Sequence, residues 1–339
     1  MSLEEDTHII ENEDEIHVSL PSPDDSNIHL IDMSEFYGTS DTSTNAKVLL
    51  ILNQDINLPL PFFAQLWNQA ELKVCADGGS TRLLHYSEKH RSELMKSSKY
   101  LLHNNNKDDN KVNEFVPDYI VGDLDSISET VRSHFLSLGT KIKQQSTTYA
   151  HDLTKSISLI NLSLNCPKVD IIGSCDDYDG LLHLETKNLD NVKSPKHATV
   201  FVLGAIGGRF DQTISAITYV TKLSAEKPQF QFILLNAEYM EFVLLLKKGR
   251  NFVHIKKNEL FFDGAIATDR VTSDGTIKLR NIGLLPLVNE VVLSTEGLKW
   301  DVKNWNSKVG GNVSSSNLVV GDNGLYVESS DYLFVNIEF

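Results

Sequence analysis

The sequence is poor in cysteine, lacks any long apolar run and has too few basic residues to balance its acidic ones. Its three cysteines, Cys75, Cys166 and Cys175, are too scattered for a disulfide framework, and no Cys-x-x-Cys pair indicates structural zinc. They are typical of free thiols in a reducing compartment. No apolar run approaches the roughly 20 residues that span a bilayer, and the N-terminus lacks a signal-peptide pattern. We therefore expect a cytoplasmic protein with no membrane partner.

The acidic balance argues against a protein that binds nucleic acid. The net charge is −15 and the isoelectric point is about 5.1. A surface that neutralises a nucleic-acid backbone needs an excess of lysine and arginine. A small anionic ligand is still allowed, because a bound metal can offset local negative charge.

The length of 339 residues and the change in texture along the chain predict two domains after a leader. Residues 1–45 are acidic and polar, which predicts a flexible leader whose deletion spares activity, although residues 28–31 could pair as an edge strand. Residues 46–248 are expected to form an α/β nucleotide-binding catalytic domain with surface insertions at 86–113 and 176–197. Residues 249–339 are expected to form a separate β-sandwich domain.

Apolar runs alternate with helical spacing in the first domain. Strands are expected at 48–52, 72–76, 119–121, 169–172 and 198–203, with helices at 127–138, 153–164 and 213–223. Such alternation predicts a mainly parallel sheet with flanking helices. Beyond residue 249, short alternating stretches with turn signals, one of them at 273–275, predict an antiparallel β-sandwich. The fold class is therefore α/β followed by all-β.

Two polar clusters directly follow predicted strands, where ligands gather in parallel α/β sheets. In Asp77-Gly78-Gly79-Ser80 the glycines would let backbone N–H groups approach an anion, although a simple helix cap explains the motif equally well. In Gly122-Asp123-Leu124-Asp125-Ser126 the two carboxylates are two residues apart. In an extended stretch they would point to the same side and suit a hard cation.

A third cluster follows the strand at 198–203 and leads into a helix. Gly207 and Gly208 allow close backbone approach, Arg209 offers a fork that matches phosphate oxygens, and Asp211 and Gln212 could orient metal, water or substrate. The segment lacks the Gly-Lys-Ser/Thr of a P-loop and the full G-x-G-x-x-G spacing. Those two nucleotide-binding folds therefore match poorly.

A fourth constellation lies at the start of a predicted helix. Asp152 could cap the helix or bind metal, and Lys155 lies three residues on, where it could reach phosphate. Either could equally be a solvated surface charge. His151 beside Asp152 suggests a base, but a lone histidine is more often structural.

Taken in order, these motifs closely resemble those of the eukaryotic thiamine pyrophosphokinases. The resemblance extends into the second domain through 295–300 and 314–317 and covers the chain from about residue 48, leaving out the two insertions. It implies that a pyrophosphoryl group passes from ATP to the hydroxyl of thiamine, giving thiamine diphosphate and AMP, with Mg²⁺ required. It also implies a homodimer with active sites between subunits.

By similarity, the resemblance assigns roles to individual residues. The carboxylates that would hold Mg²⁺ and the ATP phosphates are Asp77, Asp123, Asp125 and Asp152. Arg209, Asp211 and Gln212 would complete the nucleotide site. Ser316, Asn317 and Trp300 would contact the thiamine end, and Phe334 stands where some relatives carry a stacking tryptophan. The chain departs from the family at Tyr149 and His151, where an aspartate and a threonine are usual.

Two other functions stay open on the sequence. A different Asp- and Mg²⁺-dependent nucleotidyltransferase or phosphohydrolase would use the same clusters with another acceptor. A non-catalytic sensor of thiamine or nucleotide would bind without turnover. Mass analysis of ATP with and without thiamine separates these alternatives.

Overall fold

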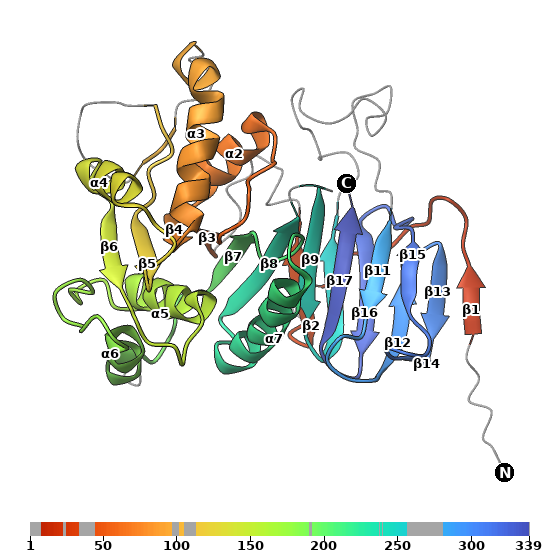
Figure 1. The fold of residues 1–339 in the computed structure, drawn as a ribbon. Helices are drawn as coiled ribbons and strands as arrows, with labels where there is room; N and C mark the ends of the chain where they lie inside the picture. Colours follow the sequence, from red (N-terminus) through yellow and green to blue (C-terminus); the bar gives the residue numbers. More distant parts are fainter. Residues whose placement is uncertain are drawn as a thin grey trace. The chain divides into compact units, whose positions relative to one another are not determined.

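The computed structural model describes residues 8–22, 25–33, 45–96, 102–104, 113–189, 192–236, 238, 240–255 and 281–338. The chain divides into two compact units, one of residues 44–238 and one of residues 1–43 with 239–339. Figure 1 shows the helices and strands of both units. Within the described ranges, no helix has the length and apolar character needed to cross a bilayer. The turn predicted at 273–275 lies outside the described residues.

Six parallel strands form the sheet of the unit 44–238. Across the sheet their order is β8-β7-β3-β4-β5-β6. The strands are β3 (Ala46–Ile51), β4 (Leu72–Ala76), β5 (Tyr119–Gly122), β6 (Lys141–Gln144), β7 (Ala198–Leu203) and β8 (Phe230–Asn236). Strand β4 is buried at every position, as expected for a parallel strand covered on both faces. The predicted α/β class with a parallel sheet is confirmed.

The chain enters this sheet in the middle and reverses direction once. It moves from β3 out to β6, then returns to β7 on the other side of β3. Because crossovers between parallel strands are right-handed, the reversal places the later helices on the opposite face. Figure 1 shows one helical layer on each side: α2 (Leu60–Gln69), α3 (Gly79–Lys96) and α4 (Glu129–Ser137), and then α5 (Asp152–Asn165), α6 (Gly180–Leu189) and α7 (Phe210–Glu226). The switch point between β3 and β7 is where such sheets bind ligands.

One predicted strand is wrong and another was missed. Residues 169–172 form bends and turns, although their apolar run resembles a strand. The edge strand is β6 instead. Its sequence Lys-Ile-Lys-Gln lacks the apolar run from which the other strands were predicted. Lys143 in β6 is buried, and its ammonium group donates to a carboxylate oxygen of Asp177 at 2.8 Å and to the carbonyl of Cys175 at 2.5 Å. Polar residues can therefore form a strand here because loop acceptors satisfy the lysine.

The described residues of the two predicted surface insertions include helical segments with buried side chains. Helix α3 continues far into the segment 86–113 and buries Tyr86. In the segment 176–197, α6 carries the buried Glu185, which accepts a hydrogen bond from Ser158 Oγ on α5 at 2.6 Å. These buried contacts make both segments part of the α/β unit.

The second unit consists of short, mainly antiparallel strands. Two orders of neighbouring strands are β15-β11-β17-β9 and β14-β12-β16-β10-β2, and β1 pairs with β13. The strands are β1 (His8–Glu11), β2 (Ile28–Asp32), β9 (Glu241–Leu246), β10 (Gly249–His254), β11 (Ile282–Leu285), β12 (Val291–Glu296), β13 (Trp300–Lys303), β14 (Trp305–Ser307), β15 (Ser314–Asn317), β16 (Gly324–Ser329) and β17 (Leu333–Glu338). The predicted antiparallel β class of this part of the chain is confirmed.

The prediction of a flexible leader over residues 1–45 is wrong for its described residues. Strand β2 pairs in parallel with β10 at the end of the five-strand order, so the alternative of an edge strand at 28–31 is confirmed. Val18 and Met33 are fully buried, and the Val18 N–H donates to an Asp322 carboxylate oxygen at 2.8 Å. This segment has few apolar residues, but the second unit covers them. Strands of the second unit also accept and donate the hydrogen bonds that the segment's backbone requires.

Candidate active site

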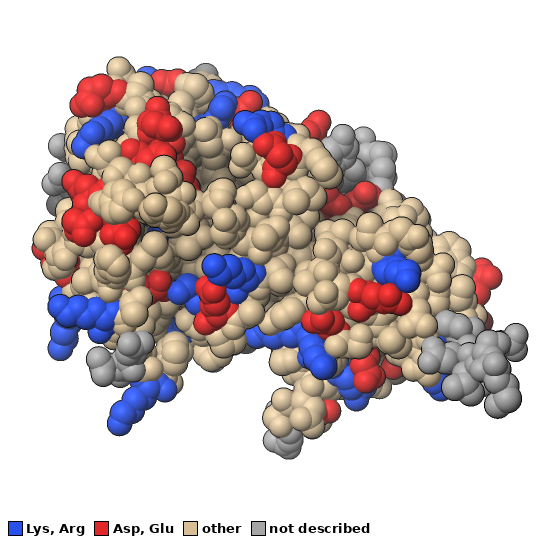
Figure 2. All heavy atoms as spheres, turned by 60° about the horizontal axis from the view of Figure 1, so that its bottom comes forward, with Lys and Arg blue, Asp and Glu red and all other residues tan. Residues whose placement is uncertain are grey.

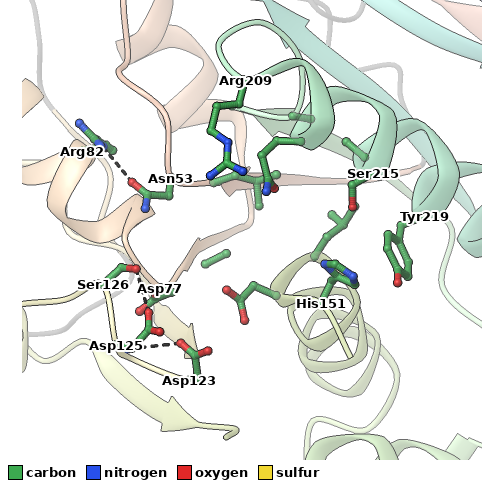
Figure 3. Close-up of a pocket in the computed structure, with 18 residues that line it drawn as sticks. Asn53, Asp77, Arg82, Asp123, Asp125, Ser126, His151, Arg209, Ser215 and Tyr219 are labelled. Carbon is green, nitrogen blue, oxygen red and sulfur yellow. Dashed lines mark hydrogen bonds between the residues drawn. The ribbon is translucent and has the colours of Figure 1, made fainter. Parts of the chain in front are cut away.

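A cavity of about 460 Å³ opens in the unit 44–238 at the carboxyl ends of the central strands. Figure 3 shows the side chains around it. It is lined by Leu52, Asn53, Ala76, Asp77, Arg82, Asp123, Asp125, Ser126, His151, Asp152, Leu153, Gly204, Ala205, Arg209, Gln212, Ser215, Ala216 and Tyr219. Leu52 and Asn53 follow β3, and Gly204 and Ala205 follow β7. The cavity therefore lies at the topological switch point of the sheet.

Three carboxylates from separate loops meet at this cavity. Asp77 follows β4, Asp123 follows β5 and Asp152 opens α5, and one oxygen of each lies within 4.8 Å of the others. Parallel strands end at the same edge of a sheet, so residues far apart in the chain converge there. Three oxygen ligands at this spacing suit a hard cation such as Mg²⁺.

Asp125 lines the cavity but is not a member of this carboxylate cluster. Leu124 has a φ of +66°, so the stretch is a turn and not the extended segment that the two-residue spacing suggested. The Asp125 N–H donates to Asp123 Oδ1 at 3.3 Å, and the Ser126 hydroxyl donates to Asp125 Oδ1 at 2.9 Å (Figure 3). The prediction that Asp123 and Asp125 point together from an extended strand is wrong. Asp77 takes the third place in the cluster.

Asp77 is the least exposed member of the cluster. Its residue is 4% exposed, and its Oδ1 atom is buried without a hydrogen-bond partner among the described residues. Burial raises the pKa of the Asp77 carboxyl and the negative charges of Asp152 and Asp123 raise it further, while hydrogen bonds from Ser126 and the Gly78 N–H lower it, so that the net shift is upward. A buried carboxylate oxygen without a partner is costly unless a cation or proton reaches it. The cluster therefore fits a metal ion.

Asp152 is held at the N-terminus of α5. Its Oδ1 atom accepts a hydrogen bond from the Lys155 ammonium at 3.0 Å. Burial raises the pKa of Asp152, Lys155 lowers it, and the negative charges of Asp123 and Asp125 raise it again, so that the net shift is upward. Lys155, predicted to reach phosphate, is only 2% exposed and is not among the lining residues. It orients Asp152.

The glycines after β4 have a packing role. A Cβ atom at Gly79 would lie 2.3 Å from the carbonyl oxygen of Ile51, and one at Gly78 would lie 2.4 Å from the Asn53 side chain. These two positions therefore let the loop that carries Asp77 approach the end of β3. Neither glycine lines the cavity, so the predicted anion contact has no support there.

The loop after β7 carries the positively charged side chain of Arg209 to the cavity. Gly207 and Gly208 have φ values of +85° and +61°, a conformation that favours glycine. Arg209 follows them and lines the cavity, with its side chain three-quarters exposed. Its Nε donates to Asp211 Oδ1 at 3.0 Å, and this hydrogen bond lowers the pKa of Asp211. Asp211 thus orients the arginine, while Gln212 lines the cavity itself.

Four lining residues with polar side chains lie outside the predicted motifs: Asn53, Arg82, Ser215 and Tyr219. Asn53 follows the apolar run of β3, a signal that identified the other clusters. Arg82 lies in the first turn of α3, and its Nε donates to Asn53 Oδ1 at 2.9 Å (Figure 3). Ser215 and Tyr219 stand three and seven residues after Gln212 on α7, which places them on one helical face.

The residues predicted to contact the thiamine end belong to the other unit and differ in solvent exposure. Trp300 is 39% exposed, and Ser316 is also exposed. Asn317 is buried, and its amide accepts from the Trp300 N–H at 3.1 Å and donates to the Trp300 carbonyl at 2.8 Å. Asn317 therefore positions the strand that carries Trp300.

The predicted substrate contact of Phe334 is wrong. Phe334 has no exposed surface and is among the largest fully buried side chains of the described residues. A ring that is fully covered by its own chain cannot stack on a ligand. Phe334 is a core residue.

Comparison with known proteins identifies the chain. The model for "Thiamin pyrophosphokinase, catalytic domain" matches residues 63–233, and that for "Thiamin pyrophosphokinase, vitamin B1 binding domain" matches residues 270–334. The thiamine pyrophosphokinase of Saccharomyces cerevisiae is 34% identical over 86% of this chain and 85% of that protein. The chain belongs to the thiamin pyrophosphokinase family.

Solved structures of this family share the fold. The thiamin pyrophosphokinase from Candida albicans superposes with a TM-score of 0.77 at 33% identity, covering 98% of each chain. The yeast thiamin pyrophosphokinase gives the same TM-score at 30% identity. The family therefore extends over both units, including the N-terminal segment that the sequence alone suggested was a leader.

Proposed function

We propose that the protein transfers the pyrophosphoryl group of ATP to the hydroxyl group of thiamine, giving thiamine diphosphate and AMP. The observation that carries this proposal is the convergence of Asp77, Asp123 and Asp152 in a cavity at the sheet's switch point, in a chain of the thiamin pyrophosphokinase family. The names of the relatives support the substrates, and the cavity supplies a site for a metal-bound polyphosphate.

The carboxylate cluster would hold Mg²⁺ through Asp77, Asp123 and Asp152, with Asp125 beside them. The bound ion would supply charge neutralisation on the phosphate oxygens. The buried Oδ1 of Asp77, which has no partner among the described residues, supports this assignment. Lys155 and Ser126 hold the neighbouring carboxylates in place through their hydrogen bonds.

This reaction requires the protein mainly to position the substrates and to stabilise the charge of the transition state. The thiamine oxygen attacks the β-phosphorus of ATP while the bond to the bridging oxygen breaks and AMP leaves. Arg209, fixed by Asp211, offsets negative charge on the phosphates, and Gln212 orients them. A carboxylate at the cavity accepts the hydroxyl proton. Trp300 and Ser316 are proposed to contact the thiamine end.

The partners proposed for this enzyme are thiamine, ATP and a second copy of the chain, with the active site between subunits as the family resemblance implies. Light scattering tests the dimer. On the face drawn in Figure 2, acidic and basic side chains are interspersed. The free thiols of Cys75, Cys166 and Cys175 support a cytoplasmic location.

Purified protein incubated with ATP, Mg²⁺ and thiamine is expected to form thiamine diphosphate and AMP in equal amounts. AMP formation should disappear when thiamine or Mg²⁺ is omitted, because the acceptor and the metal are both required. Mass analysis of the products measures this. Release of AMP or phosphate without thiamine would instead support a phosphohydrolase, and tight binding without turnover would support a sensor.

A further inference from the structure

The cavity has two sides of different chemistry. Figure 3 shows Asn53 and Arg82 on one side and His151 and Tyr219 on the other, with carboxylates between them. The Arg82 guanidinium donates to Asn53 Oδ1 and to Asp55 Oδ1, at 2.9 Å and 2.7 Å. That side is charged and polar. Among the lining residues, His151 and Tyr219 are the two with aromatic rings.

The two rings contact each other and form one wall, which is called the aromatic wall here. Their centroids are 4.3 Å apart, and their planes are inclined by 47°. Neither ring is fully buried, and both face the cavity. Because the two planes are inclined, one ring can stack face to face on a planar ligand group while the other contacts its edge.

Helix α7 fixes the distance between the aromatic wall and the phosphate end. Gln212, Ser215, Ala216 and Tyr219 all line the cavity, and their spacing of three, four and seven residues places them on one face of the helix. Tyr219 lies seven residues after Gln212, roughly 10 Å along the axis. A ligand whose phosphates contact Gln212 and Arg209 must therefore be extended to reach Tyr219, as a nucleotide is.

The His151 side chain is exposed at the cavity. It is the N-cap residue of α5, yet its side chain makes no capping hydrogen bond. Serine, threonine or aspartate caps a helix better than histidine does. The N-cap position of α5 therefore carries a ring that faces the cavity and not a capping side chain.

We propose that His151 and Tyr219 bind the base of the nucleotide by stacking and make the site prefer a purine over a pyrimidine. The proposal rests on the proposed function, because it assumes that the phosphates lie at the carboxylate cluster. A purine offers two fused rings to the aromatic wall, and a pyrimidine offers one. Thiamine is then bound away from this wall.

Replacing Tyr219 with alanine should raise the KM for ATP by about tenfold, within the range that base stacking on an aromatic side chain supports. The kcat should change little, because the stacking stabilises bound ATP and the transition state equally. The KM for thiamine should also change little, because thiamine does not contact the aromatic wall. Tyr219→Phe keeps the ring and should behave like the wild type. His151→Thr removes the ring while supplying a better helix cap, and it should raise the KM for ATP by about fivefold.

The preference for ATP over CTP gives a second readout. The ratio of their kcat/KM values should fall in Tyr219→Ala and stay unchanged in Tyr219→Phe. Tyr149→Ala is the matched control, because Tyr149 is 87% exposed and does not line the cavity. A rise in the KM for thiamine instead of ATP, or an unchanged ATP preference, would overturn the proposal.

Calorimetry with AMP separates this inference from the proposed function. AMP carries the base without the terminal phosphates, so its affinity should fall by about tenfold in Tyr219→Ala even if thiamine is not the acceptor. Unchanged AMP affinity would overturn the base site alone. Absence of thiamine-dependent AMP formation in the wild type, with AMP binding still sensitive to Tyr219, would overturn the proposed function alone.

Discussion

Replacing Asp77 with asparagine is expected to lower the transferase activity by at least about 100-fold and to make the metal-free protein more stable. The activity falls because the variant loses one of three oxygen ligands with negative charge. The stability rises because the Asp77 oxygen is buried without a partner among the described residues, and a neutral amide costs less to bury than a carboxylate. The backbone tolerates the change, since Asp77 has a φ of +42° and asparagine accepts this conformation.

Thermal unfolding in EDTA and in Mg²⁺ measures this prediction. Because burial and like charges raise the folded-state pKa of Asp77, the metal-free wild type loses stability as the pH rises through that pKa. At neutral pH in EDTA, Asp77→Asn should therefore melt a few degrees above the wild type. Added Mg²⁺ should raise the wild-type melting temperature and have little effect on the variant.

Asp14→Asn is the matched control for the Asp77 variant, because the Asp14 side chain is 97% exposed. It should alter neither activity nor the response to Mg²⁺. If Asp77→Asn kept wild-type turnover, or if Mg²⁺ stabilised it as much as the wild type, the proposed metal site would be wrong.

Deleting residues 1–33 is expected to unfold the second unit rather than spare activity. Three buried side chains, Val18, Ile31 and Met33, would be lost, each contributing roughly 1.5–3 kcal/mol. Their sum is comparable to the whole free energy of unfolding of a typical domain. The deletion also removes β1, which pairs with β13 and matches Glu11 with Trp300. The expected result is a chain that is insoluble or inactive.

Point variants test the same segment without a large truncation. Met33→Ala should lower the free energy of unfolding by about 2–5 kcal/mol, because it empties a fully buried site. Leu20→Ala is the control, since Leu20 is 53% exposed and its replacement should change stability by at most about 0.5 kcal/mol. Chemical denaturation measures both. Equal stability of the two variants would contradict the buried placement of Met33.

The N-terminal segment also supports the proposed thiamine end. Asn12 Nδ2 donates to Asp301 Oδ2 at 2.6 Å, and the Asn12 N–H donates to the Lys299 carbonyl at 2.8 Å. Asp301 is buried and accepts from the N–H groups of Gly297 and Leu298, both at 3.1 Å. These bonds hold the turn before Trp300. An acidic, polar segment thus has a defined structural role that its composition did not suggest.

Local patterns predicted much of the α/β unit correctly. The apolar runs of β3, β4, β5 and β7 are strands, because such runs are stable only when buried on both faces. The wrong predictions involve residues whose contacts come from distant parts of the chain. The β6 strand depends on acceptors near residue 177 to satisfy Lys143, and residues 169–172 lack a strand partner in the sheet.

The candidate site shows the same division between features that local sequence patterns predict and features that depend on distant contacts. Polar residues at strand ends marked Asp77, Asp123 and Arg209, and a predicted helix start marked Asp152. All four line the cavity. Side-chain direction was not predictable from spacing, because the positive φ of Leu124 turns Asp125 out of the carboxylate cluster. Tyr219 also gave no signal, since a tyrosine on a helix resembles any core-facing residue until the neighbouring loops are in place.

The sequence by itself determined the class of fold, the acidic clusters and the family, because these depend on apolar periodicity and on motifs that are local in the chain. The tertiary structure decided which carboxylates meet, that Phe334 is core and that the N-terminal segment belongs to the second unit. The physical reason is that burial and convergence depend on contacts between distant segments. Only the path of the chain through the sheets creates those contacts.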